Sequence, residues 1–206
     1  MPDKVDLTRE IDAYRARRGE FRVVDVPPVR YLAIDGSGDP NTSDRYRETL
    51  ETLYPVAYAA KFASKAAGRD YVVPPLEGLW WADDMAAFTT ARDKSRWHWT
   101  MLLLLPDWLD DAAVDDAIAR AARKEPPRLA ELRVLELREG TSVQTLHVGS
   151  FDDEAPVLAR MHDEIIPGLG MRMTGVHHEI YLSDPRRTAP ERLRTILRQP
   201  VVPASA

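Results

Sequence analysis

The order of secondary-structure signals runs twice along the chain, and this repeat limits the possible folds more than any other feature of the sequence. In each half, strand-like segments flank one apolar stripe at helical spacing. The first half has predicted strands at 21–26, 29–34, 70–81 and 96–105 with a helix from near Tyr46, and the second has strands at 132–137, 142–148, 175–183 and 194–198 with a helix from 150–153. When the two segments before each helix are taken as one β stretch, each half reads strand, helix, strand, strand, which predicts an α+β fold of two pseudo-symmetric modules.

The length of 206 residues suits one large domain or two halves that share a core. We predict a polar N-terminal lead-in at 1–20 and a single domain at 21–202. Within that domain, one module covers about 21–106, a connecting helix lies in 108–128, and the second module covers about 130–202.

Composition excludes several classes of protein. The absence of cysteine rules out disulfides, thiolate nucleophiles and Cys-ligated zinc. A net charge of -5 without any run of basic residues counts against nucleic-acid binding. The first 20 residues are too polar for a signal peptide, and the longest apolar run, 101–105, is far shorter than a membrane span. We therefore expect a cytoplasmic protein that binds neither nucleic acid nor membrane.

Motifs for metals and cofactors are also missing from the sequence. His177 and His178 are adjacent in a predicted strand, so their side chains point to opposite faces and do not chelate one metal ion. The segment 35–40 holds two glycines but lacks the lysine and the spacing of a phosphate loop. We expect no metal, no cofactor and no obligate protein partner.

Two glutamates stand out because strand alternation places each of them beside aromatic rings. In the strand at 176–182, Glu179 shares a face with His177 and Tyr181. In the corresponding strand of the first half, Glu77 shares a face with Trp81 and lies next to Trp80. The next strand adds Trp97, Trp99 and Met101, so four of the five tryptophans fall within 80–99.

These residue types predict one groove, lined by Glu77 and Glu179 from the two halves, in which a flat hydrophobic molecule stacks on indole rings. A carboxylate in such a groove attracts a cation, or burial raises its pKa so that it acts as a general acid or base. The sequence leaves both uses open. It also leaves open a solvated strand face around Glu179, and a core position for the tryptophans with Glu77 paired to an arginine.

Several motifs resemble those of the stand-alone GyrI-like small-molecule-binding proteins, over roughly residues 20 to 202. The two most specific are Pro75-Leu-Glu-Gly-Leu-Trp-Trp81 and His177-His-Glu-Ile-Tyr-Leu-Ser-Asp-Pro-Arg-Arg187. The others lie at 31–41, 53–58, 70–73 and 195–201. The resemblance implies a curved antiparallel sheet around a central ligand channel, and an ancestry shared with the effector domains of multidrug-sensing regulators. We expect no DNA-binding helix-turn-helix domain in front of this domain, and therefore no regulation by direct DNA binding.

The resemblance also implies roles for individual residues and two possible functions. Glu179 matches the central acid of the family and Glu77 the second acid, so both are candidate catalytic residues. The candidate ligand-binding residues are Trp80, Trp81, Tyr181, His177, Tyr31, Trp97, Trp99 and Met101. One implied function is hydrolysis of cyclopropane-bearing aromatic genotoxins of the yatakemycin and duocarmycin type, in which the two glutamates activate water and protonate the product. The alternative is a non-catalytic protein that sequesters or senses cationic aromatic compounds.

Overall fold

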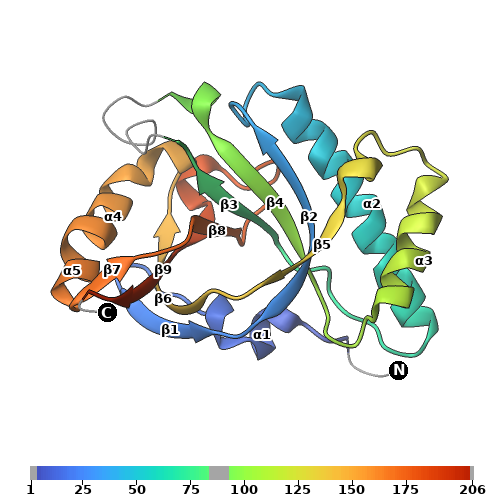
Figure 1. Ribbon diagram of the computed structural model, residues 1–206, viewed down its shortest axis with the longest axis horizontal. Coiled ribbons are helices and arrows are strands. Elements are labelled where there is room, and N and C mark those ends of the chain that lie inside the picture. The colour runs from blue at the N-terminus through green and yellow to red at the C-terminus, as the bar shows by residue number, and fades with distance from the viewer. Residues whose placement is uncertain (1–3, 84–92, 205–206) are drawn as a thin grey trace.

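The computed structural model describes residues 4–83 and 93–204, so the first three residues of the predicted lead-in lie outside the described part. Within these ranges, nine antiparallel strands form one curved sheet in the order β1-β6-β9-β8-β3-β4-β2-β5, and β7 pairs with β9 (Figure 1). The strands are β1 (Arg22–Val26), β2 (Val29–Ser37), β3 (Leu76–Trp81), β4 (His98–Leu105), β5 (Arg133–Leu137), β6 (Gly140–Val148), β7 (Met171–Met173), β8 (His177–Tyr181) and β9 (Arg194–Pro203). The α+β class and the antiparallel curved sheet are confirmed.

The two longest helices start where the sequence places their caps, whereas the helix predicted from 150–153 begins at Ala155, after a 3-10 turn. Ser43 and Asp110 accept backbone hydrogen bonds at the starts of α2 and α3, which satisfies donors that a helix leaves free. The helices are α1 (Leu7–Glu10), α2 (Asp44–Ala66), α3 (Asp111–Ala122), α4 (Ala155–Ala159) and α5 (Ile166–Gly168). Pro55 lies inside α2, which continues through it. A π-helical turn, Arg160–Ile165, joins α4 to α5.

The two halves exchange their first strands. β1 pairs with β6 of the second half, with Arg22 opposite Gln144. In the same way, β5 pairs with β2 of the first half, with Tyr31 opposite Leu135. The centre of the sheet is the β3·β8 pair, where the halves meet.

Both major helical layers cover the same face of the sheet. Paired residues in antiparallel strands share a face, and the register pairs Met101 with Gly78, Gly78 with Glu179, and Glu179 with Leu197. Met101 packs in the core under α2 and α3, and Leu197 packs with Met161 and Ile166 of the α4–α5 segment. Figure 1 shows α2 and α3 at one end of the sheet and α4 and α5 at the other, with β3 and β8 between them. We call this side the helical face.

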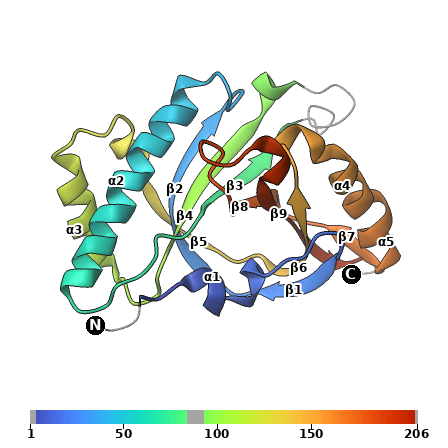
Figure 2. The same ribbon diagram turned by 180° about the vertical axis from the view of Figure 1, so that it is seen from behind.

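The N-terminal segment covers the opposite face, which we call the N-terminal face. Leu7 of α1 and Tyr14 of a 3-10 turn, Asp12–Tyr14, pack there against Leu79, Leu102 and Ile180. The segment with α1 runs near β1 in both views (Figure 2). The described part of the N-terminal lead-in, from residue 4 on, therefore contributes Leu7 and Tyr14 to the core.

No helix among the described residues has both the length and the apolar character needed to cross a membrane.

Candidate ligand-binding site

Glu179 lies at the centre of the helical face and is partly buried. Its side chain is 13% exposed and that of His177 is 10% exposed. The Tyr181 hydroxyl donates to Oε2 of Glu179 over 2.8 Å, and Nε2 of His177 lies 3.5 Å from Oε1. No Lys or Arg of the described chain forms an ion pair with this carboxylate. Burial raises the pKa of Tyr181 well above its usual range, and the charge of Glu179 adds to the effect.

Aromatic rings from the first half lie beside this carboxylate. Nε1 of Trp80 donates to the Tyr181 hydroxyl over 2.8 Å, and the ring of Trp97 packs edge-on against Trp80 at 5.8 Å. Gly78 leaves the space that these rings occupy, because a Cβ there would lie 2.7 Å from both Trp80 Nε1 and the methyl carbon of Met101. We call Glu179, His177, Tyr181 and Trp80 the Glu179 cluster.

Four further residues border the Glu179 cluster, and sequence reasoning missed them. The ring of Phe151 lies edge-on to Tyr181 at 5.6 Å. Glu154, which is 5% exposed just before α4, contributes to the raised pKa of Tyr181. Burial raises the pKa of Tyr46 of α2, and the charge of Glu179 adds to this rise. His162 lies with its ring centre 6.1 Å from that of His177. The helical spacing of apolar residues in α2 includes Tyr46, so the sequence could have indicated it. Glu154 stands at a helix start, where a glutamate resembles an ordinary cap.

Glu77 lies on the opposite face of the sheet, so the prediction that both glutamates line one cavity is wrong. Side chains alternate between the two faces along β3 as predicted, but the register pairs Gly78, not Glu77, with Glu179. Glu77 is fully buried on the N-terminal face, where Tyr14 and Tyr31 donate hydrogen bonds to it.

A buried chain of alternating charges extends from Glu77. Nε2 of His178 lies 2.9 Å from Glu77, Nδ1 lies 3.0 Å from Glu139, and Arg198 donates to Glu139 over 2.8 Å. Burial by itself lowers the pKa of His178, but Glu139 and Glu77 outweigh it and raise the pKa to about 9. Burial acts against ionised Glu139, yet His178 and Arg198 lower its pKa to about 2. This chain has the partners of a structural core network.

The predicted ligand-binding residues divide between the two faces. Tyr31 and Trp81 lie with Glu77 on the N-terminal face, where Trp81 stacks on His98 at 5.8 Å. The helical face holds the others, Trp80, Tyr181, His177, Trp97, Trp99 and Met101. Trp99 and Met101 are 0% exposed beneath α2, so they support the neighbouring rings from below.

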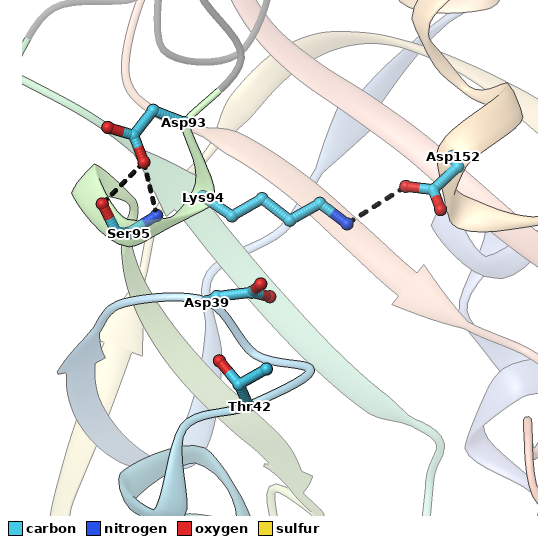
Figure 3. A pocket seen from close by; sticks show the side chains of 6 residues that line it. All are labelled: Asp39, Thr42, Asp93, Lys94, Ser95 and Asp152. Carbon is cyan, nitrogen blue, oxygen red and sulfur yellow. Dashed lines mark hydrogen bonds and ion pairs between the residues drawn. The ribbon is translucent and has the colours of Figure 1, made fainter.

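A pocket of about 710 Å³ is lined by residues from both halves of the chain. Its lining residues are Asp39, Thr42, Asp93, Lys94, Ser95 and Asp152. Figure 3 shows the Lys94 side chain extending across the pocket to Asp152, with Nζ 3.0 Å from the carboxylate. Nζ of Lys94 also lies 5.7 Å from the ring centre of Trp97, which contacts Trp80. The pocket is thus one ring away from the Glu179 cluster. Among the described residues, no group of His, Asp or Glu has the arrangement of a metal site.

A curved antiparallel sheet with a partly buried carboxylate and indole rings at its centre, flanked by helices from two related halves, defines a small-molecule-binding domain. The chain belongs to the family described as the GyrI-like small molecule binding domain, which matches residues 19–202. The resemblance drawn from the motifs is therefore confirmed.

Solved structures agree with this assignment. An uncharacterized conserved protein from Listeria innocua is 35% identical, with 97% of this chain and 100% of that chain covered and a TM-score of 0.87. A protein described as a hydrolase from Listeria innocua is also 35% identical at the same coverage, with a TM-score of 0.83. The C-terminal domain of EcmrR is 11% identical over 89% of this chain and 98% of that chain, with a TM-score of 0.53, and shows likeness of fold alone. No match is found among the curated proteins.

Proposed function

We propose that the protein binds a flat, hydrophobic aromatic electrophile on the helical face beside Glu179 and hydrolyses a strained cyclopropane ring in it, as in genotoxins of the yatakemycin and duocarmycin type. The observation that carries the proposal is a partly buried carboxylate without a Lys or Arg partner in the described chain, set among Tyr181, Trp80 and His177. Membership of a small-molecule-binding family and 35% identity to a protein described as a hydrolase support it.

The reaction adds water across one bond of the three-membered ring. The water oxygen bonds to the ring methylene, the cyclopropane carbon–carbon bond breaks, and its electron pair passes through the conjugated system to a carbonyl oxygen. That oxygen takes up a proton and becomes a phenol. Glu179 lies beside the rings on which the aromatic part stacks, so its carboxylate orients the attacking water. Glu77 takes no part in this mechanism because the sheet separates it from the helical face.

A test is to incubate the protein with a cyclopropane-bearing aromatic alkylator and to follow the ring-opened product by chromatography. We expect Glu179→Gln to lower kcat about 10²-fold or more while the fold is kept, because amide replaces carboxylate at the reacting water. Glu136→Gln on edge strand β5 is the matched control, since Glu136 is exposed and pairs with Arg138. Undiminished turnover by Glu179→Gln would overturn the assignment of Glu179.

A second function uses the same cluster. A carboxylate that has no Lys or Arg partner among the described residues and borders indole and phenol rings also suits a cationic aromatic compound. Saturable quenching of tryptophan fluorescence by a cationic dye, lost in Glu179→Gln, together with no product from the alkylator, would favour a binding protein over a hydrolase.

A further inference from the structure

His177 offers two ring nitrogens that no described protein group uses for a hydrogen bond. The side chain is 10% exposed, and its Nε2 faces Oε1 of Glu179 at 3.5 Å. Buried polar nitrogens are ordinarily paired, so a buried imidazole with both nitrogens unused is a candidate for a functional role. A movement of about 0.5 Å closes the gap to Glu179 to hydrogen-bond length.

The carboxylate of Glu179 is oriented so that it presents one oxygen to His177. Its other oxygen, Oε2, accepts from the Tyr181 hydroxyl, and that hydroxyl in turn accepts from Nε1 of Trp80. Trp80 lies directly opposite His177 in the β3·β8 pair. The result is a carboxylate of fixed orientation that faces an imidazole, and closing the gap gives the arrangement in which an acid orients a histidine base and stabilises its protonated form.

His162 supports this pair from the α4 side. The π-helical turn Arg160–Ile165 carries it, and the ring packs edge-on to His177 with 6.1 Å between ring centres. Burial lowers the pKa of His162 to about 4, so the ring is neutral at pH 7. A neutral neighbour does not repel a positive charge that develops on His177. Single π-helical turns within helices are frequent at functional sites.

We propose that His177 is the general base of the hydrolysis, with Glu179 as the group that orients it and stabilises its imidazolium. The inference rests on the proposed ring-opening reaction. His177 takes a proton from the water as the oxygen–carbon bond forms and the ring bond breaks. The imidazolium then returns this proton, directly or through solvent, to the phenolate oxygen that received the electron pair. Every atom of the added water is retained in the product, and no other reactant is needed.

An imidazole suits this task better than the carboxylate alone. General-base catalysis is most effective when the base titrates near the working pH, and histidine is the side chain that ordinarily does so between about pH 5 and 8. A carboxylate is ordinarily the weaker base of the two, although it stabilises a neighbouring cation. The roles of Glu179 and His177 therefore differ, and the two are separable by experiment.

Charged and titratable groups surround His177 from each element packed around it. Glu179 and Tyr181 come from its own strand, and His162 comes from the π-helical turn with Asp163 beside it. Glu154 and Tyr46 lie close enough to add to the raised pKa of Tyr181, the neighbour of His177 on the same strand face. Of these groups, only His177 and His162 are imidazoles, and His162 titrates at about pH 4. The proton acceptor among these groups is therefore tested by substitution of His177.

The experiment measures kcat/KM for alkylator hydrolysis from pH 5 to 9 in the wild type, His177→Gln and His177→Ala. We expect the wild-type rate to rise with pH because protonation removes the base, and both variants to lose about 10²–10⁴-fold and that rise. Free imidazole is expected to restore part of the rate to His177→Ala, where it fills the space left by the ring. His98→Gln is the control, because His98 is part-exposed against Trp81 on the other face.

The outcomes separate this inference from the function on which it rests. If the wild type binds the alkylator but forms no product, the hydrolytic function fails and His177 has no base role. If the wild type hydrolyses it while folded His177→Gln keeps the wild-type rate and pH dependence, only the assignment of His177 is overturned. A loss of rate in His177→Ala that imidazole does not restore, with an unchanged pH profile, makes His177 a packing residue and also overturns the assignment.

Discussion

The buried ion chain on the N-terminal face makes the stability of the protein depend on pH in the alkaline range. His178 is 0% exposed between Glu77 and Glu139, and these carboxylates raise its pKa from 6.5 to about 9 against the effect of burial. The folded protein therefore holds a proton on His178 at pH values where the unfolded chain has released it. Stabilisation by this group is complete below pH 6.5 and is lost as the pH rises through about 9.

The size of the effect follows from the same two values. Each pH unit between 6.5 and about 9 removes about 1.4 kcal/mol, so the free energy of unfolding falls by on the order of 3 kcal/mol over this interval. That is a large part of the 5–15 kcal/mol typical of a domain, roughly speaking. Beyond pH 9 the loss levels off, because both states have then released the proton.

Urea unfolding followed by tryptophan fluorescence, at half-unit steps from pH 6 to 10, measures directly how the free energy of unfolding changes with pH. His178→Gln removes the titrating group and is expected to flatten the curve, whereas His98→Gln should keep it. A wild-type curve that is flat between pH 7 and 9, or a slope that persists unchanged in His178→Gln, would refute the charge assignment of this chain.

Two further substitutions test how the two faces are built. Gly78→Ala places a methyl group 2.7 Å from Trp80 Nε1 and the Met101 methyl carbon. We expect thermal unfolding to show that the free energy of unfolding falls by about 1–3 kcal/mol, and ligand binding to weaken as Trp80 and Tyr181 move. A wild-type Tm and a wild-type affinity would contradict this packing. Tyr14→Phe removes a hydrogen-bond donor from fully buried Glu77. We expect urea unfolding to show that the free energy of unfolding falls by about 1–3 kcal/mol, with turnover unchanged. Reduced turnover in the folded variant would mean that the N-terminal face contributes to activity.

Local signals in the sequence were sufficient for most elements. Polar caps at Ser43 and Asp110 gave the starts of α2 and α3, because these side chains bind free backbone donors in place. The segment at 70–81 is a strand only from Leu76 onward, since Pro74 and Pro75 lack the N–H groups that a sheet ladder needs. β7 has three residues, too few for a periodic pattern to be visible.

The candidate site was predicted only in part because register is not a local property. Alternation gave the correct neighbours within each strand, namely His177 and Tyr181 for Glu179. Which residue of β3 lies opposite Glu179 depends on pairing between segments far apart in sequence, and a shift by one residue exchanges the two faces. Glu77 was therefore expected beside Glu179 and lies behind it. Glu154 and His162 come from helical segments of the second half, where nothing in their immediate sequence indicates the sheet residues they border.

The exchange of β1 and β5 between the two halves makes each half depend on the other. Each half alone would lack an outer strand and would expose the backbone donors and acceptors of β6 or β2 as a bare edge. Neither half is therefore a complete folding unit, and the Glu179 cluster, with Trp80 from one half and Tyr181 from the other, forms only when the whole chain has closed on itself. Two fragments separated between β4 and β5 would each lack an outer strand pair and one side of the Glu179 cluster.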